Sequence, residues 1–474
     1  MKNQLISALA IVVIVLAASP ASAEVLYNIT DLGTLGGNSS RAYSINNSGQ
    51  IVGQAKDASN RMHATLFDPT GNGHNINLGT LSGGSSMALS INNSGQIVGH
   101  AFVTMTDHHA VLFDSTGAGQ NIDLDTLGGN RSNAHSINNN GQIVGSAEPA
   151  SGKRHATLFD PTGQGNNINL GTLGGDTTSS ASSINDEGQI VGGSDIDYYQ
   201  HSHATLFDPT GDGNNIGLGT LYGYFNSGAK AINNNGQIVG AVWQNPLEWD
   251  TFRAVLFDPT GSGGNIDLNP LGGSSAAYSI NNNGQIVGWA CRCVGGLCRP
   301  HAALFDPTGQ GNNIDLNTLI DPNLGWKLIY AECINDKGWI VGNGKNQDGY
   351  SRAFLLKPIL PPIEAEIDIN PDTLNLQSKG KWISCHIWLP EDYDVADVNS
   401  YSVLLEDEIE AEWIWADEQE QILMAKFSRS ALQEILAELE TPIQVELLVT
   451  GELIDGTIFE GTDTVKVIDK GKQK

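Results

Sequence analysis

The sequence is poor in basic side chains, which limits the partners that it can bind. It holds 24 Lys and Arg against 52 Asp and Glu, a formal net charge of −28. Nucleic acids and anionic membrane surfaces are bound through basic patches, so this balance argues against both as partners. The acid is concentrated in residues 363–474, which hold 25 acidic against 8 basic side chains. Solubility is the plainest interpretation of such a charge.

Familiar catalytic patterns are also missing. No G-x-S-x-G, H-E-x-x-H or P-loop pattern occurs in a context that would support it. The sequence therefore predicts no cofactor and specifies no reaction. Paired carboxylates for glycoside cleavage stay open as an alternative, because their spacing is set in three dimensions and not along the chain.

The N-terminus carries an apolar run that is short for a membrane span. Lys2 precedes the run from Leu5 to Ala18, and Pro20-Ala21-Ser22-Ala23 follows it. A charged start, a short apolar core and a small-residue end are typical of a cleavable signal peptide, predicted here over residues 1–23. An uncleaved anchor is the alternative, although a bilayer span needs roughly 20 residues. We expect a secreted protein, extracellular, on the cell surface or periplasmic, with no transmembrane segment in the mature chain.

The dominant feature of the sequence is a repeat. The second half of the motif S-I-N-N-S-G-Q-I-V-G at residues 44–53 returns five times as G-Q-I-V-G and once as G-W-I-V-G, with spacings of 46, 46, 47, 48, 48 and 54 residues. A fixed period in this range indicates a repeat architecture. The first copy contains four short strand candidates, at residues 42–46, 50–55, 62–68 and 75–81, separated by turn residues and one variable loop. No segment has a helical period, so each copy predicts one blade of a β-propeller.

Seven copies predict an all-β protein with a seven-bladed β-propeller over residues 24–357. The two ends of the array complement each other. Residues 25–35 match a fourth strand without its first three, whereas the seventh copy, ending at residues 352–356, lacks a fourth strand. We therefore expect the N-terminal strand to close the ring, which removes exposed sheet edges. An open β-solenoid is the alternative.

The repeat resembles a known family. The combination of L-G-T-L-G-G, S-I-N-N-x-G-Q-I-V-G and H-A-x-L-F resembles the HAF family of extracellular repeats found in bacterial secreted proteins, and it covers residues 24–357. The resemblance implies export and a repeat fold, and it carries no established activity. Arg253 and Arg352 depart from the pattern where five copies have His, and Trp339 replaces the usual Gln.

The loop between the second and third strands differs in every copy, whereas the other two turns hardly change. In an up-and-down blade this loop and the connection to the next blade emerge on the same face, so we expect a ligand there. Aromatic rings beside carboxylates would suit a glycan or a protein at the cell surface; packing over the ends of neighbouring blades is the alternative. The predicted binding residues are Asp195, Asp197, Tyr198, Tyr199, Tyr222, Tyr224, Trp243 and Trp249.

Repeated histidines and acids suggest metal ligands at first. The histidines begin the third strand of five different blades, so the ring would hold them apart, and we interpret them as repeated hydrogen bonds between blades. Asp208-Pro209-Thr210-Gly211-Asp212 has oxygen ligands at calcium-like spacing, but the Asp212 position varies among the copies. No metal site is predicted. The histidines are His63, His109, His155, His203 and His301.

Three of the five cysteines fall close together, at Cys291, Cys293 and Cys298. In an exported protein a local disulfide such as Cys293 to Cys298 is the favoured interpretation. A zinc site is the alternative, although the cluster has no paired C-x-x-C and no obvious fourth ligand. Cys333 and Cys385 are expected to be buried or free.

Beyond residue 357 the repeat ends. Prolines mark a stiff linker over residues 358–362. Seven alternating strand candidates then predict an acidic, immunoglobulin-like β-sandwich over residues 363–474, with one helix opened by a capping box at residues 430–433. The strand candidates are residues 363–369, 382–389, 402–406, 412–415, 422–427, 443–452 and 457–467.

These features favour an exported, non-enzymatic repeat protein that binds a glycan or a protein on the variable-loop face of the propeller. A polysaccharide-active propeller enzyme, a lyase or a glycoside hydrolase with acids around the central mouth of that face, is the alternative. A structural protein of a cell-surface layer is a third interpretation.

Overall fold

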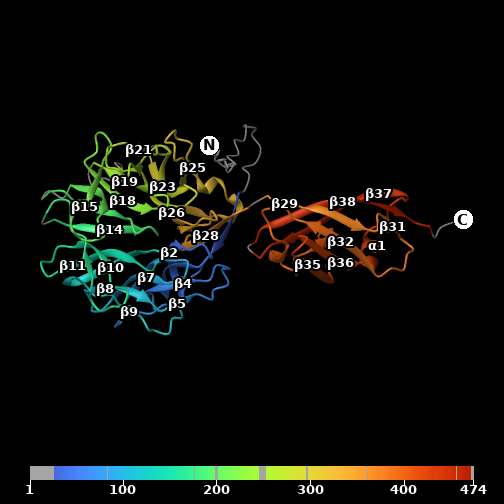
Figure 1. Ribbon diagram of the computed structural model, residues 1–474, viewed down its shortest axis with the longest axis horizontal. Helices are drawn as coiled ribbons and strands as arrows, with labels where there is room; N and C mark the ends of the chain where they lie inside the picture. Colours follow the sequence, from blue (N-terminus) through green and yellow to red (C-terminus); the bar gives the residue numbers. More distant parts are fainter. Residues whose placement is uncertain are drawn as a thin grey trace, which may run out of the picture. The chain divides into compact units, whose positions relative to one another are not determined.

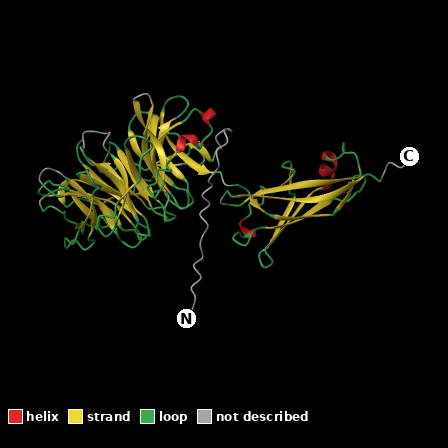
Figure 2. Ribbon diagram, turned by 90° about the horizontal axis from the view of Figure 1, so that it is seen from above, coloured by secondary structure: helices red, strands yellow, loops and turns green. Residues whose placement is uncertain are grey.

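The computed structural model describes residues 26–470 apart from positions 83, 176, 198–200, 245–251, 295–296, 360 and 455. The predicted signal peptide therefore lies outside the described residues. The protein is all-β, as predicted (Figure 2). Among the described residues no helix is long and apolar enough to cross a membrane. The chain divides after Pro358 into two compact units, here named the ring unit (residues 26–358) and the C-terminal unit (residues 359–470).

The ring unit consists of seven four-stranded antiparallel sheets (Figure 1). The first strand of each sheet lies nearest the axis of the ring, where the first strands together surround one cavity. An Asn-x-Gly turn follows it, in which the Gly adopts a positive φ, 82° at Gly49. The first strands are β2 (Gly36–Ile45), β6 (Ser86–Ile91), β10 (Gly128–Ile137), β14 (Ser179–Ile184), β18 (Asn226–Ile232), β22 (Ser275–Ile280) and β26 (Lys327–Ile334).

The second and third strands form a hairpin whose loop varies among the sheets. The second strands are β3 (Ile51–Asp57), β7 (Ile97–Phe102), β11 (Ile143–Pro149), β15 (Ile190–Asp195), β19 (Ile238–Trp243), β23 (Ile286–Val294) and β27 (Ile340–Lys345). The third strands are β4 (Met62–Phe67), β8 (His108–Phe113), β12 (His155–Phe159), β16 (Ser202–Phe207), β20 (Arg253–Phe257), β24 (Leu297–Phe305) and β28 (Ser351–Pro358). Two 3₁₀ turns, η2 (Leu316–Thr318) and η3 (Pro322–Leu324), lengthen the connection into the seventh sheet.

The fourth strands are short, and the last sheet takes its fourth strand from the N-terminal part of the chain. β1 (Tyr27–Asp31) pairs antiparallel with β28, from Tyr27 opposite Pro358 to Asp31 opposite Phe354. β28 thus extends through Pro358, the first residue of the predicted linker. The other fourth strands are β5 (Ile76–Asn77), β9 (Ile122–Asp123), β13 (Ile168–Asn169), β17 (Ile216–Gly219), β21 (Ile266–Asp267) and β25 (Ile314–Asp315).

Two cycles of hydrogen bonds close the ring at the turns after the first strands. In the first cycle, Nδ2 of Asn46 donates to the carbonyl of Asn92 (2.9 Å), and equivalent bonds follow until Asn335 donates to the carbonyl of Asn46 (3.0 Å). In the second cycle, the backbone N–H of Asn47 donates to Oδ1 of Asn93 in the next sheet. Equivalent bonds follow around the ring until the N–H of Asp336 donates to Oδ1 of Asn47. The Ile-Asn-Asn part of the motif recurs because each copy contributes to both cycles.

The apolar core of the ring unit is divided among the interfaces between neighbouring sheets. Val52 and Leu78 of the first sheet pack with Ile97 of the second, and equivalent residues pack at the following interfaces. At the closure, Ile51 of the first sheet packs in one cluster with Leu355 of the last. Every sheet thus buries both faces, which fits strands with runs of buried residues such as Ile51–Asp57.

The C-terminal unit packs two sheets around one apolar cluster. Alternation along β32 places Ile383, Cys385 and Ile387 in that cluster. One sheet contains, in order, β29 (Ile363–Glu364), β38 (Ile458–Ile468), β37 (Ile443–Glu452), β33 (Leu404–Leu405) and β34 (Ile409–Glu410), with β31 (Thr373–Asn375) also paired to β38. The other contains β30 (Glu366–Asn370), β32 (Trp382–Trp388), β36 (Ile422–Ser428) and β35 (Trp413–Asp417).

Two predictions for this unit were wrong in detail. The single strand predicted at residues 363–369 is two strands in different sheets, because the chain crosses between the sheets at Ala365, whose N–H donates to Glu460 (2.7 Å). The helix α1 (Arg429–Ile435) begins before the predicted capping box. Ser428, still extended at the end of β36, accepts the capping hydrogen bond from the N–H of Ala431 (3.4 Å).

Candidate functional site

A cavity of about 1240 Å³ lies on the axis of the ring unit. The first strands form most of its wall. Its rim includes residues 152–154 and 195, 202, 243 and 252, which flank the loops between second and third strands. Described residues in or beside three of the variable loops, those of the third, fourth and fifth sheets, therefore line this cavity.

A β-bulge sets one residue of every first strand into the wall of this cavity. In all seven sheets the pairing of first and second strands shifts at the x position of the A-x-S-I-N segment, in which Ala231 and Cys333 replace Ser in the fifth and seventh copies, so that residue has no partner. A bulge bends its strand and re-aims the extra side chain. All seven bulged residues line the cavity, and we name them the bulge ring. They are Tyr43, Leu89, His135, Ser182, Lys230, Tyr278 and Glu332.

The bulge explains the second glycine of the G-Q-I-V-G motif. A Cβ on Gly53 would lie 2.0 Å from the carbonyl oxygen of Arg41 on the facing strand. The equivalent distance is 1.9 Å at Gly99 and 2.1 Å at Gly288. No other residue fits without moving the backbone, so this glycine and the bulge that fills the cavity wall occur together in every copy.

Glu332 is the acid of the bulge ring, and it interacts with two cations. Burial raises the pKa of Glu332 to about 7, while the charges of Arg41 and Lys230 oppose that rise. Nδ2 of Asn343 donates a hydrogen bond to its Oε1 (2.9 Å). Desolvation lowers the pKa of Lys230, although its side chain is still accessible from within the cavity. The wall thus holds a carboxyl group that changes charge near neutral pH beside two cationic groups.

Aromatic rings of the sixth and seventh sheets form an aromatic shelf, defined as Tyr278, Tyr330 and Trp289. The two tyrosine rings stack with centroids 6.4 Å apart, and the indole meets Tyr330 edge-on at 6.2 Å. Burial raises the pKa of both tyrosines, which keeps the hydroxyls protonated. The Trp289 side chain is 5% exposed, and its indole N–H has no acceptor in hydrogen-bond geometry among the described residues. The N–H is nevertheless close enough to the Tyr278 hydroxyl to oppose part of the rise in the pKa of that hydroxyl.

The third sheet adds further polar groups to the wall. Nδ1 of His135 lies 2.7 Å from the carbonyl of Ala181, so Nδ1 carries the proton of that hydrogen bond. Desolvation lowers the pKa of His135, and the charges of Lys230 and Arg154 act in the same direction. Its imidazole is therefore neutral at pH 7 and presents no additional positive charge.

The structure brings two of the predicted binding residues to the cavity. The Trp243 ring stacks on Phe252 with centroids 5.5 Å apart, and both residues line the rim. Asp195, also on the rim, accepts a hydrogen bond from Oγ1 of Thr178 (2.6 Å). Tyr198, Tyr199 and Trp249 lie outside the described residues.

Three other predicted residues lie away from the cavity. Tyr222 is fully exposed, and Asp197 pairs with His201 of its own loop (2.7 Å). Tyr224 packs on the apolar cluster between the fourth and fifth sheets, and its hydroxyl accepts from Nε of Arg253 (3.2 Å). Tyr224 therefore covers a sheet interface, which was the alternative interpretation of these aromatics.

Comparisons with known proteins add little to this picture. No family model matches the sequence, and no curated protein does. One solved structure, described as the extracellular domain of a one component system, BT4673 from B. thetaiotaomicron, is 12% identical with a TM-score of 0.40; the alignment covers 95% of this chain and 59% of that one. A second solved structure is described as the extracellular domain of a hybrid two component system, BT4673 of the same organism. It is 10% identical with a TM-score of 0.15, and the alignment covers 90% of this chain and 81% of that one. The chain thus spans about 59% of the first of these structures. Both are extracellular domains, and at these scores neither supports a functional argument.

The far end of the ring axis is scaffold. A polar cavity of about 180 Å³ there is lined by the Ile-Asn-Asn segments. Asp186 uses Oδ2 to accept from Asn139 (2.9 Å) and Asn234 (2.8 Å), and Asp336 accepts in the same way from Asn47 and Asn282. The carboxylates at this end are thus bonded to their neighbours in the ring.

Four of the repeated histidines, His63, His109, His155 and His301, lie against polar side chains of their own sheet, which corrects the expectation of bonds between blades. His109 and His301 lie against the acid 14 residues later, Asp123 (2.9 Å) and Asp315 (2.7 Å), and His155 lies against Asn169 (3.1 Å). The third and fourth strands pair side by side, which places these two side chains next to each other. Among the described residues no group of three or more His, Cys, Asp or Glu is arranged to hold a metal ion.

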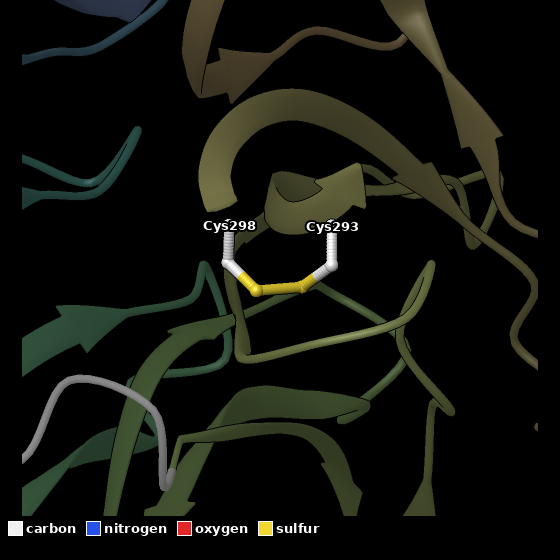
Figure 3. The surroundings of a disulfide bond; sticks show 2 residues. All are labelled: Cys293 and Cys298. Carbon is white, nitrogen blue, oxygen red and sulfur yellow. A yellow bond between two sulfur atoms is a disulfide. The ribbon is translucent and has the colours of Figure 1, made fainter. Parts of the chain in front are cut away.

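Cys293 and Cys298 form a disulfide at the tip of the hairpin of β23 and β24 (Figure 3). The two residues stand directly opposite each other across the strands. Cys291, Cys333 and Cys385 are free thiols. A Cβ on Gly273 would lie 2.9 Å from Cβ of Cys291, so the hairpin packs closely on the preceding connection.

Proposed function

We propose that the protein is an exported binding protein that holds its ligand, a glycan or a protein segment, in the axial cavity of the ring unit. In this proposal the ring unit is a seven-bladed β-propeller of HAF type, closed by its N-terminal strand. The C-terminal unit is an immunoglobulin-like sandwich that serves as spacer or docking module. The single observation that carries the proposal is the bulge ring.

The bulge ring supports binding because its residues differ while everything around them repeats. The flanking Ala, Ile and Asn are the same in all seven copies, and the facing glycine is invariant. A purely structural wall gives no reason for seven copies that otherwise repeat to carry Lys, Glu, His, Ser, Leu and two Tyr at one equivalent position. Diverse groups converging on one cavity are typical of a ligand site.

The proposal is tested by screening the full chain against a glycan array and a panel of extracellular peptides. Tyr278→Ala and Trp243→Ala should each weaken binding of whichever ligand is found. The matched control is Asn72→Ala, because the second copy already has Ala118 at the equivalent exposed turn position. Unchanged affinity in both cavity variants, or loss in the control, would place the site elsewhere.

A second candidate function is an enzyme acting on polysaccharides. The observation that favours it is Glu332, whose pKa of about 7 suits a general acid or base at neutral pH. Incubating a bound polysaccharide with the protein separates the two functions, because new reducing ends or unsaturated ends would reveal cleavage. Cleavage that is abolished by Glu332→Gln, with ligand binding retained, would make the protein an enzyme.

A further inference from the structure

The charge of the cavity wall differs from that of the rest of the ring unit. Residues 26–358 contain 26 Asp and Glu against 15 Lys and Arg. The residues that line the cavity reverse this balance, with Arg41, Lys153, Arg154 and Lys230 against three acids. A chain that is acidic almost everywhere thus gathers cations around one concave surface, which raises the local concentration of anions.

Three of these cations lack a close ion pair among the described residues, although the charge of Glu332 interacts with two of them, Arg41 and Lys230. Among the residues that the structure describes, Arg41, Arg154 and Lys230 form no ion pair within 4.0 Å, whereas other cations of the ring unit, such as Arg131 and Arg292, do. All three line the cavity, where the side chains of Arg41 and Lys230 are exposed and that of Arg154 is half-buried. A cation that lines a cavity without a close ion pair can form a charged hydrogen bond with an anionic ligand, so each is a candidate partner for a carboxylate.

Two of the three acids of the wall, Glu332 and Asp195, already accept hydrogen bonds from neighbouring side chains. Asn343 donates to Glu332, and Thr178 donates to Asp195. Burial further favours the neutral form of Glu332, because its pKa is raised to about 7. Below that pH the wall becomes more positive.

The aromatic shelf stands beside the cations. Tyr278 follows Lys230 in the bulge ring and precedes Glu332, and Tyr330 lies on the same strand as Glu332. Stacked rings provide a flat apolar surface, while the two tyrosine hydroxyls provide hydrogen-bond donors. A pyranose ring presents the complementary pattern, with apolar C–H faces and hydroxyls at its edge.

We infer that the cavity binds a carboxylate-bearing saccharide, such as a uronic acid unit of an acidic glycan. Lys230, with Arg41 or Arg154, would receive the carboxylate, and the aromatic shelf would receive the face of the sugar ring. This inference rests on the proposed function and names the ligand class of the same site. The size of the cavity, about 1240 Å³, accommodates an oligosaccharide and not only one sugar.

The test uses the full chain and matched pairs of probes. Short oligogalacturonate, oligomannuronate and hyaluronan fragments are compared with their carboxyl-reduced counterparts by isothermal titration calorimetry. We expect at least one acidic probe to bind. Its carboxyl-reduced form should bind at least about tenfold more weakly, because a charged hydrogen-bond partner is lost.

Two variants separate the parts of the site. Lys230→Met should weaken the acidic probe about tenfold and leave the carboxyl-reduced probe unchanged, whereas Tyr278→Ala should weaken both. Lys337→Met is the control, because Lys337 is an exposed lysine of the turn at the far end of the seventh sheet. Melting temperatures of all variants establish that they are folded.

The outcomes distinguish the inference from the proposed function. Equal binding of acidic and reduced probes overturns the carboxylate inference and keeps glycan binding. Absence of binding by every acidic probe also overturns it, and the glycan and peptide screen then decides the proposed function separately. An acidic probe whose binding is insensitive to Lys230→Met, Arg41→Met and Arg154→Met sits outside the cavity, which overturns the inference as well.

Discussion

Gly192 and Gly193 stand next to each other in β15, yet only one of them is constrained by the fold. A Cβ on Gly192 would lie 2.0 Å from the carbonyl oxygen of Ser180, whereas a Cβ on Gly193 meets nothing closer than Oγ of Ser202 at 3.4 Å. Neither glycine has a positive φ, so backbone strain does not separate them. The difference arises from the bulge at Ser182, which pushes the facing strand toward Gly192.

Gly192→Ala should therefore destabilise the ring unit by about 1–3 kcal/mol, the usual cost of overpacking. Gly193→Ala should change the free energy of unfolding by no more than about 0.5 kcal/mol. Urea unfolding of the two variants side by side checks this. Equal effects would mean that the bulge does not impose the glycine.

Glu332 gives the ring unit a pH dependence with a defined sign. Its folded-state pKa, about 7, lies above the ordinary value of 4.5, so the folded state favours the protonated form. The contribution to stability is complete below pH 4.5 and is lost as the pH rises through 7. Arg41, Lys230, Tyr43, Tyr278 and Tyr330 face this carboxyl group; the two cations moderate the loss but do not reverse it.

Glu332→Gln should thus stabilise the ring unit at pH 8, by roughly 1–3 kcal/mol, and leave it nearly unchanged at pH 4. Thermal unfolding of both proteins across this range measures the difference. Asp336→Asn is a useful comparison, because that acid sits on the same strand-turn segment at the scaffold end. A stabilisation of Glu332→Gln that did not grow with pH would contradict the assignment.

At the scale of elements, the strands were predictable and the bulges were not. The turn at Asn47 recurs in all seven copies, with Asp in two of them, and the turn at Gly71 recurs in the first six, so four strands per repeat could be predicted. A bulge adds one residue without changing the apolar pattern on either side, so the x position of A-x-S-I-N looked like part of a regular strand. The signal was nevertheless present, because Lys230 and Glu332 stand where the copies otherwise agree.

The remaining differences between the predictions and the structure also arise where local sequence does not determine the tertiary arrangement. Variation among the loops predicts a site that includes Tyr222 and Tyr224, since loops usually carry function, whereas the variable residues that line the cavity lie inside the strands. The change of sheet at Ala365 depends on pairing with β38, and the position of Ser428 at the end of β36 depends on the pairing of β36 with β32. Local sequence does not specify either.

β1 is the element that joins the two ends of the ring unit. It pairs along its whole length with β28, and Leu32, which follows it, is completely buried. A chain that starts at residue 33 should expose the edge of β28, lower the melting temperature and associate through that edge. Size-exclusion chromatography with light scattering compares it with a chain that starts at residue 26. A monomeric, equally stable truncated chain would show that β1 is dispensable for closure.

At the scale of the whole molecule, the two units have separate cores and different charges. The apolar cluster of the C-terminal unit contains only residues from 363 onward, and that of the ring unit is divided among its sheet interfaces. The acidic excess is concentrated in the C-terminal part, whereas the unpaired cations line the axial cavity. Each unit should therefore unfold in its own transition.

Ligand binding should then shift only one of the two transitions. An acidic saccharide at about 100 times its dissociation constant would add about 2.7 kcal/mol to the ring unit and raise its melting temperature by a few degrees. The transition of the C-terminal unit should stay in place, because that unit contributes no residue to the cavity. Differential scanning calorimetry of the full chain, with residues 361–470 alone as the reference for the second transition, measures both. A shift of the second transition would move the ligand site to the C-terminal unit. An equal shift of both would mean that the units unfold as one, so that the separate cores do not make them independent.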